Sequence, residues 1–245
     1  MTIFLLARLS TRRIPGQPLD LPMTRTASRK PRRPAADLPD VAPKKLPTQS
    51  RAVETYERIL ATAAELLGEV GIERLSTNLV CRRLGLSPPA LYQYFPNKYA
   101  ILHELGQRLM QRQNELLGPW ATPATMALPE AEFAASVAEV FLQTLRVTQE
   151  MPGGAWITRA LRAVPSLQEV RNQSHDQMTE LLMQVFHAAH PAAEPVRARL
   201  SVRLYIDALY TALELLFDDP SQPAEAVATT MADMVAGHFV RVRAT

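Results

Sequence analysis

The 245-residue sequence predicts an all-α fold. Apolar residues recur at the three- and four-residue spacing of a helix face through most of residues 51–243. No stretch shows the alternation of apolar and polar residues, bounded by turn dipeptides, that is typical of β-strands. Proline and glycine fall between the periodic segments and separate one helix from the next. This length allows one large or two small domains with an ample core.

Two helices with clear stop signals are predicted at the start of the periodic region. The first covers residues 51–70, has one apolar face and ends at Gly71. The second begins after Ser76, because serine is a favoured N-cap residue. It ends at Gly85, because glycine best tolerates the left-handed conformation that follows many helices.

A third, short helix follows almost immediately. Ser87 is its N-cap candidate, and Pro88 occupies the first helical position, where a missing N–H costs nothing. Phe95-Pro96 closes the helix. A helix, a glycine turn and a second short helix form a helix-turn-helix, whose second helix can enter the major groove of DNA. We therefore expect residues 51–98 to form a DNA-binding domain.

The spacing within this segment resembles the DNA-binding domain of TetR-family transcriptional regulators. Eleven positions match the family pattern in order and without gaps, namely Gly71, Ser76, Val80, Gly85, Leu86, Ser87, Leu91, Tyr92, Tyr94, Phe95 and Lys98. Pro89 and Ala90 depart from it, because the family often has Gly and then Thr or Ser there. The resemblance covers residues from about Arg51 to Leu117.

This resemblance implies which side chains contact DNA. The side chains expected to face the major groove are Ser87, Pro88, Ala90, Gln93 and Tyr94. Gln93 is the strong candidate for bidentate contact with adenine. The side chains expected to contact phosphates, and so to carry no sequence information, are Ser76, Thr77, Tyr92 and Lys98. The alternative for Tyr92 and Tyr94 is half-buried packing, and for Lys98 it is a solvated helix start.

The N-terminal segment is strongly basic. Residues 1–50 contain ten Lys/Arg against three Asp/Glu, a net charge of +7, and they show no apolar periodicity. Such a segment is predicted to be a disordered tail, because it cannot bury enough surface to offset its ordering entropy. Lys44, Lys45 and Arg51 are its candidates for phosphate contacts, and a solvated tail with no specific role is the alternative.

Other features bear on the compartment. Cys81 is the single cysteine, so no intrachain disulfide is possible, and we expect an inert, buried thiol. The apolar run at residues 1–9 is too short to span a membrane, and it lacks the leading basic residues of a secretion signal. Met23 offers an alternative translation start. We expect a cytoplasmic bacterial protein that associates with the nucleoid.

Residues 99–245 are predicted to form a helical effector-binding and dimerisation domain. Its helices are expected at 98–117, 133–148, 155–164, 165–190, 195–217 and 223–243, with a loop at 119–129. Candidate residues for an effector pocket, which the resemblance implies, are Met110, Trp120, Phe133, Phe141, Trp156, Met178 and Tyr205, with Arg159 and His175 as polar groups. Such residues line apolar pockets, but they also form ordinary cores. An apolar or amphipathic small molecule is the expected effector.

The last two predicted helices favour a homodimer. The helix at 195–217 is apolar on nearly all sides beyond Leu204, so both of its faces need cover. Two such helices from each subunit would form a four-helix bundle, as the resemblance also implies. The interface candidates are Leu209, Leu213, Leu216, Met231, Met234, Val235 and His238. The alternative is a monomer in which these helices bury one another.

The sequence contains no pattern of catalytic residues that we recognise. There is no G-x-S-x-G, no glycine-rich phosphate loop and no cysteine pair, and the H-E-x-x-H pattern begun by His103 fails at Gln107. We expect no enzyme activity, no cofactor and no metal site. The expected function is a transcriptional repressor that a small effector releases from a pseudo-palindromic, double-stranded DNA operator, with no membrane partner. The alternatives are a ligand-independent regulator or activator, and a helical ligand carrier or adaptor without a DNA function.

Overall fold

The computed structural model describes residues 38–44 and 47–244. These residues form helices and no strand, which confirms the predicted all-α class. The elements are α1 (Ser50–Arg74), α2 (Thr77–Leu84), α3 (Pro88–Tyr92), α4 (Lys98–Trp120), α5 (Pro123–Met126), α6 (Glu130–Glu150), α7 (Gly154–Ala163), η1 (Pro165–Leu167), α8 (Gln168–Ala189), α9 (Pro195–Asp218) and α10 (Ala224–Arg243).

Two helices run beyond their predicted ends. Helix α1 continues past Gly71 for one more turn, and Gly71 is a kink within it because its φ of 74° is left-handed. Helix α4 continues through Pro119 to Trp120, since the fixed φ of proline is compatible with a last helical turn. The predicted loop after it contains the short α5, where the Thr122 hydroxyl caps the helix by accepting from the Thr125 N–H.

Residues 38–44 lie against the segment that joins α3 to α4, which corrects the expectation of a disordered tail up to residue 50. The Asn97 side-chain amide donates to the carbonyl oxygen of Asp40 at 2.8 Å. The backbone N–H of Lys44 donates to the carbonyl oxygen of Tyr94 at 2.9 Å. We name residues 38–44 the arm.

The arm is held by backbone hydrogen bonds and by one apolar side chain. Val41 is partly buried and packs against the core. A single apolar contact has no period, so the sequence pattern could not reveal it. The expectations for residues 1–37 and for Lys45 lie outside the described part of the chain.

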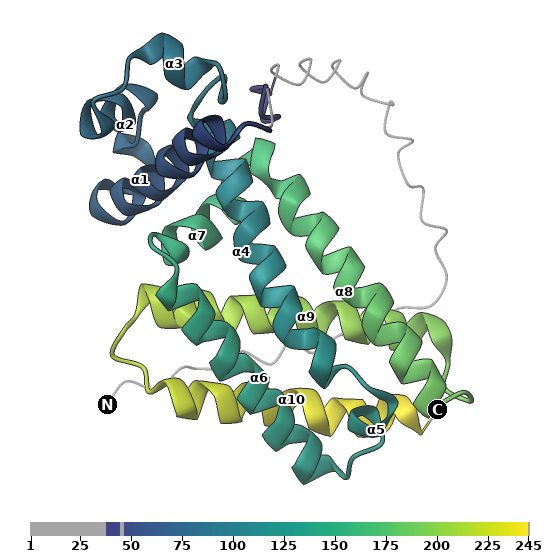
Figure 1. The fold of residues 1–245 in the computed structure, drawn as a ribbon. Coiled ribbons are helices and arrows are strands. Elements are labelled where there is room, and N and C mark those ends of the chain that lie inside the picture. The colour runs from purple at the N-terminus through teal and green to yellow at the C-terminus, as the bar shows by residue number, and fades with distance from the viewer. Residues whose placement is uncertain (1–37, 45–46, 245) are drawn as a thin grey trace, which may run out of the picture. The chain divides into compact units, whose positions relative to one another are not determined.

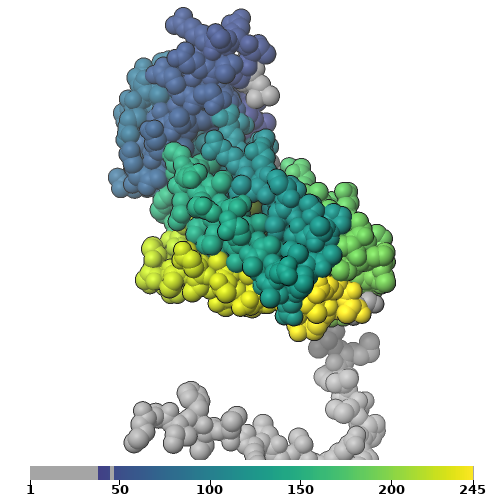
Figure 2. Space-filling model, turned by 60° about the horizontal axis from the view of Figure 1, so that its bottom comes forward, coloured from purple at the N-terminus to yellow at the C-terminus, as the bar shows by residue number. Residues whose placement is uncertain are grey.

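Helix α4 connects the first three helices to the remaining ones. Figure 1 shows α1, α2 and α3 gathered at one end, with α4 running from them into the remaining helices. There α10 packs against α6 and α9, and α8 packs against α4 and α9. Figure 2 shows α10 beside α6 on the face that it presents. One continuous cluster of buried side chains includes residues from the DNA-binding helices and from α6 to α10.

Helix α7 packs on both α1 and α4 at glycines. A Cβ at Gly71 would lie 3.3 Å from the Trp156 ring, so the indole packs directly on the kink of α1. A Cβ at Gly106 would lie 2.6 Å from a methyl of Leu161, which only glycine allows without a shift. We name the contacts of α7 with α1 and α4 the α7 joint. None of the described helices is long and apolar enough to cross a membrane.

Candidate DNA-binding surface and effector cavity

The helix-turn-helix forms as its capping residues predict. The Ser76 hydroxyl accepts from the N–H of Leu79 at 3.2 Å, so it is the N-cap of α2. Gly85 has a φ of 65°, the left-handed conformation in which glycine is favoured. Leu86 follows, and its N–H donates to the carbonyl oxygen of Cys81 at 3.0 Å. Cys81 is buried, as predicted.

Helix α3 is shorter than the predicted helix, which starts at Pro88 and is closed by Phe95-Pro96. It ends at Tyr92, and Gln93 is its C-cap residue. The fully buried Leu91 anchors α3 to the core, while Ser87 and Gln93 remain exposed at its two ends. Within the described residues the Ser87 hydroxyl makes no capping bond, contrary to its predicted role. The exposed Pro88 and the half-buried Ala90 lie between Ser87 and Gln93 and complete the candidate DNA-binding surface of α3.

Hydroxyl groups from α2 and α3 meet on this surface. The Tyr92 hydroxyl and the Thr77 hydroxyl lie 3.1 Å apart, and either can donate to the other. Tyr92 is exposed, so this hydroxyl pair faces solvent. Tyr94 is half-buried, and its ring packs edge-on against Tyr56 with the centroids 6.0 Å apart. The pair therefore suits a phosphate contact, whereas the Tyr94 ring supports the fold.

Lys98 is engaged inside the domain. Its ammonium donates to the carbonyl oxygen of Ile72 at 2.9 Å, next to the kink at Gly71. A lysine at this place satisfies one of the free carbonyls in the last turn of α1. Lys98 is therefore not a solvated helix start. Any contact of Lys98 with a phosphate would compete with its bond to Ile72, and loss of the side chain would disturb α1.

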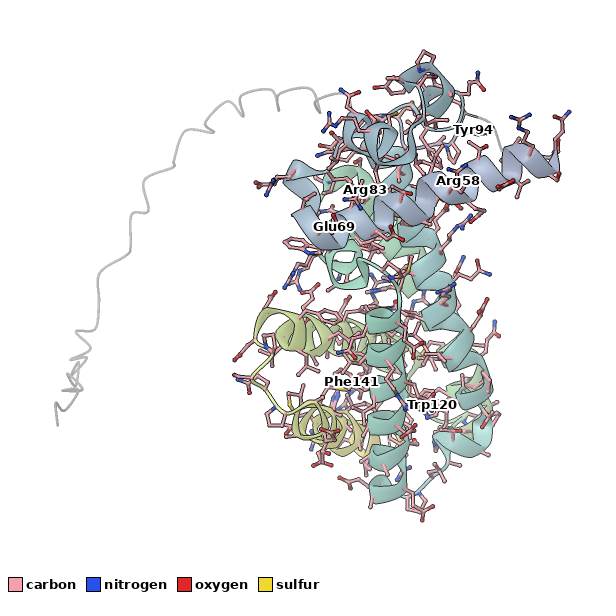
Figure 3. All side chains as sticks on the ribbon, turned by 60° about the vertical axis from the view of Figure 1, so that its left-hand side comes forward. Arg58, Glu69, Arg83, Tyr94, Trp120 and Phe141 are labelled. Carbon is pink, nitrogen blue, oxygen red and sulfur yellow. The ribbon has the colours of Figure 1, made fainter. Side chains whose placement is uncertain are left out.

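Exposed basic side chains are present on the arm, α1 and α2. Lys44 of the arm and Arg51 in the first turn of α1 are exposed, as the phosphate assignment requires. Arg83 of α2 forms an ion pair with Glu69 of α1 at 2.7 Å (Figure 3), which joins the two helices. Arg82, the neighbouring residue on α2, is also exposed. It is a further candidate for a phosphate contact, which the sequence pattern did not indicate.

An apolar cavity of about 80 Å³ lies among α4, α6, α8, α9 and α10. Five of the nine predicted pocket residues line it, namely Trp120, Phe133, His175, Met178 and Tyr205. Other lining residues, which the sequence did not single out, include Gln113, Val137, Thr144, Leu209, Tyr210 and Phe239. Figure 3 places Trp120 well away from Tyr94, so the cavity is remote from the DNA-binding surface.

Four predicted pocket residues do not line the cavity. Phe141 is fully buried in the core, one position round α6 from the lining Val140. Met110 lies behind the lining, where its sulfur is 3.8 Å from the Tyr210 hydroxyl.

The other two, Trp156 and Arg159, lie on α7 outside the cavity. Trp156 packs on α1, and the Arg159 guanidinium lies 4.9 Å from its ring centroid. Arg159 also donates to the Asp218 carboxylate at 2.6 Å.

A buried chain of hydrogen bonds borders the cavity. The Tyr210 hydroxyl donates to the Gln113 side-chain oxygen at 3.0 Å, and the Gln113 amide donates to the Thr148 hydroxyl at 2.7 Å. The Thr148 hydroxyl donates to the carbonyl oxygen of Thr144 at 2.7 Å. Burial raises the pKa of Tyr210 well above its ordinary value, so the phenol stays neutral.

His175 is buried beside this chain. Its side chain is 0% exposed, and its ring stacks on Tyr210 with the centroids 4.5 Å apart. Nδ1 lies 3.0 Å from a carboxylate oxygen of Asp207. Burial lowers the pKa of His175 to about 4, and the nearby positive charge of Arg171 adds to this effect. The imidazole is therefore neutral at physiological pH.

Asp207 is held by two arginines as well as by His175. Arg171 donates to it at 3.1 Å and Arg203 at 3.4 Å. Burial alone would raise the pKa of Asp207, but the positive charges and the hydrogen bond from His175 lower it below its ordinary value. The carboxylate is thus ionised. In the sequence, the only sign of this charged cluster is the i, i+4 spacing of Arg171 with His175 and of Arg203 with Asp207.

The structure corrects the predicted dimer interface. Four of its members are buried within the protomer and pack on its own core, namely Leu213, Leu216, Met231 and Val235. Leu209 lines the cavity, and His238 accepts or donates a hydrogen bond at 2.9 Å with the Tyr205 hydroxyl. Only Met234, which is 73% exposed, lies on the surface as predicted.

A different set of apolar side chains is exposed on α9. It comprises Val196 (74% exposed), Leu200 (60%), Leu204 (55%) and Leu215 (45%). These residues share one side of the helix, because successive members are four, four and eleven residues apart. We name them, with Met234 of α10, the apolar stripe. The stripe replaces the predicted list as the candidate dimer surface.

Comparison with known proteins agrees with this architecture. The family model described as "Bacterial regulatory proteins, tetR family" matches residues 59–105. The tetracycline repressor protein class C of Escherichia coli is 44% identical over 54 residues, which cover 22% of this chain and 25% of the relative. The class G repressor of Vibrio anguillarum is 38% identical over 56 residues, which cover 23% and 27%. The matched segment thus spans about a quarter of the length of these curated relatives.

Solved structures share the fold over a much longer part of the chain. A tetR-family transcriptional regulator from Streptomyces coelicolor has a TM-score of 0.56 at 18% identity, covering 78% of this chain and 82% of its own. SmeT, the repressor of the Stenotrophomonas maltophilia multidrug efflux pump SmeDEF, has a TM-score of 0.56 at 19% identity, covering 74% and 88%. Residues 59–105 thus match the TetR family of bacterial regulatory proteins, and the chain as a whole shares the fold of solved TetR-family regulators.

Proposed function

We propose that this protein is a homodimeric transcriptional repressor that a small apolar or amphipathic effector releases from a pseudo-palindromic DNA operator. The observation that carries the proposal is α4, which begins at the helix-turn-helix and ends as a wall of the cavity. A molecule in the cavity therefore contacts the helix that positions the DNA-binding surface. A repressor of this kind would act in the cytoplasm, where bacterial DNA lies.

DNA binding is supported by the curated relatives and by the helix-turn-helix itself. The curated relatives are named as tetracycline repressors, and the match covers about a quarter of their length. The helix-turn-helix also has the exposed polar side chains that contact DNA in such motifs. This argues against a ligand carrier without a DNA function. The cavity in turn favours an effector over ligand-independent regulation.

Effector control would act through the spacing of two helix-turn-helix domains. In a dimer the two recognition helices must lie about 34–36 Å apart to enter successive major grooves. Gln113, Leu117 and Trp120 of α4 line the cavity, and Leu161 of α7 packs on α4 at Gly106. A ligand that binds better to a shifted α4 would favour a spacing that does not fit DNA.

The direct test is binding of the full chain to DNA from upstream of its own reading frame. In a gel shift we expect a complex that persists against excess non-specific DNA. A protein that binds all DNA equally, or none, contradicts the proposed function. Footprinting should then show two half-sites about one helical turn apart, since the two domains of a dimer bind in this way.

Base recognition is expected to depend on Gln93. The Gln93→Ala variant should lose roughly 1–3 kcal/mol of discrimination at one base pair in each half-site, because an adenine loses its bidentate partner. The measurement is competition binding with operators substituted at each position.

Tyr92→Phe is the matched control for that variant. It removes the hydroxyl paired with Thr77 while leaving the ring, so it should weaken binding to all sequences alike. If Gln93→Ala leaves the base preference unchanged, the docking of α3 in the major groove is wrong.

The arm is expected to contribute to the salt dependence of DNA binding. If Lys44 and Arg51 each neutralise one phosphate per subunit, the Lys44→Ala/Arg51→Ala dimer loses about four units from the slope of log K against log salt. Arg112→Ala/Arg146→Ala removes the same charge from exposed positions on α4 and α6 and should keep the slope. Equal slopes for both variants would show that neither Lys44 nor Arg51 contacts DNA.

A further inference from the structure

The hydrogen bond between His175 and Asp207 fixes which ring nitrogen carries the proton. The ionised Asp207 carboxylate can only accept hydrogen bonds, and Arg171 and Arg203 keep it ionised. Nδ1 of His175, 3.0 Å away, must therefore be the donor. A neutral imidazole has one N–H, so Nε2 carries a lone pair and is an acceptor.

This acceptor has no partner in the part of the chain that the structure describes. Nε2 is fully buried, and His175 lines the cavity. Two lining hydroxyls are already used as donors, because Tyr210 donates to Gln113 and Thr144 donates to the carbonyl oxygen of Val140. The third, on Tyr205, is hydrogen-bonded to Nδ1 of His238 at 2.9 Å. A buried acceptor left without a donor is unfavourable. A donor on a molecule inside the cavity would satisfy it.

The charges around the cavity argue against an anionic ligand. Nε2 presents a lone pair, and the Asp207 carboxylate lies behind the ring. The arginines nearby, Arg171 and Arg203, are engaged by Asp207, and Arg203 also by Asp176. One buried donor without a partner among the described residues, the Trp120 indole N–H, suits an acceptor oxygen but cannot compensate a buried carboxylate.

We infer that the effector is a neutral, mainly apolar molecule whose hydroxyl or N–H group donates a hydrogen bond to Nε2 of His175. This inference rests on the proposed function, because it identifies the ligand class of the proposed effector cavity. The cavity volume of about 80 Å³ is small compared with typical ligand pockets of about 300–1,000 Å³. A molecule with a single ring is therefore the suitable probe of the cavity as the structure shows it. A water molecule is the competing donor.

Three one-ring probes separate the possible ligand classes. Phenol can donate to Nε2, anisole has a methyl group in place of that proton, and benzoate is an anion at neutral pH. In calorimetric titrations of the full chain at pH 7.5, we expect phenol to bind about tenfold more tightly than anisole. We expect benzoate not to bind.

Two variants assign the preference to His175. His175→Phe keeps an aromatic ring against Tyr210 and leaves Asp207 paired with its arginines, so phenol and anisole should bind this variant about equally. Gln173→Leu makes a polar-to-apolar change at an exposed position of the same helix and should keep the preference. A preference for phenol that persists in His175→Phe would show that another group accepts the proton.

A measurement on the unmodified protein does not depend on how the variant folds. The ¹⁵N resonances of His175 should show an unprotonated Nε2 in the free protein, and phenol should shift that resonance as anisole does not. A proton on Nε2 in the free protein overturns the inference. So does equal binding of phenol and anisole, which would mean that water satisfies Nε2, while the cavity itself would still bind ligand. Failure of all three probes to bind overturns both the inference and the effector part of the proposed function, whereas DNA binding is tested separately by the gel shift.

Discussion

Leu204→Glu and Met234→Glu should each give monomers that remain helical and lose operator binding. Both side chains belong to the apolar stripe, and both are more than half exposed in the protomer. A dimer that covers the stripe would bury the new carboxylate without a partner, which is strongly unfavourable. Because linking two binding modules raises affinity by about 10²–10⁴-fold, a monomer should bind the operator at least about 100-fold more weakly.

Sedimentation at micromolar concentration, circular dichroism and operator titration together test this expectation. Gln177→Glu adds the same charge at an exposed position of α8, outside the stripe, and should leave both dimerisation and DNA binding unchanged. A wild-type protein that sediments as a monomer contradicts the proposed four-helix bundle. A Met234→Glu dimer with full operator affinity would show that the stripe is not the interface.

The dimer surface also shows where sequence periodicity stops being informative. Residues 195–217 are apolar on nearly all sides, so the pattern indicates that both faces need cover. It does not say which face the protomer covers itself. The fold decides this, because α9 packs on α8 and α10 with Leu213 and Leu216 buried, while Leu204 and Leu215 remain exposed.

The helix-turn-helix was predictable because its determinants are local. Ser76 caps α2 through a residue three positions away, and Gly85 adopts the left-handed conformation on its own. Fixed spacing then brings Leu91 into the core. The same local reasoning failed for Ser87, which resembles a cap in sequence but forms no capping bond within the described residues.

The polar side of the cavity depends on contacts between distant parts of the chain. Tyr210 and Gln113 are 97 residues apart in sequence, and His175 and Asp207 are 32 apart. No periodic pattern encodes such pairs. The sequence identified His175 as a polar candidate near apolar residues. Its tautomer follows from the hydrogen bond to Asp207, and its neutral state follows mainly from burial, neither of which the sequence pattern shows.

The free energy of unfolding is expected to decrease between pH 6.5 and pH 4 because of His175. Burial lowers its pKa in the folded protein from 6.5 to about 4. Above pH 6.5 the imidazole is neutral in both states and adds no pH dependence. Between these values the unfolded chain binds a proton that the folded protein does not, so unfolding becomes easier as the pH falls. At pH 4 this histidine should reduce the stability by about 3 kcal/mol relative to pH 7.5.

Urea unfolding from pH 7.5 to pH 4.5, compared between the wild type and His175→Phe, isolates this contribution. The charged groups facing His175 are Asp207 and Arg171, with Arg203 nearby, and they remain in the variant. Asp207 has a lowered pKa, so its own contribution is lost only at pH values below its ordinary 3.8, outside this window. His103, whose pKa burial also lowers, contributes equally to both proteins. The variant should therefore lose less stability on acidification, and parallel curves for the two proteins would show that His175 titrates normally in the folded state.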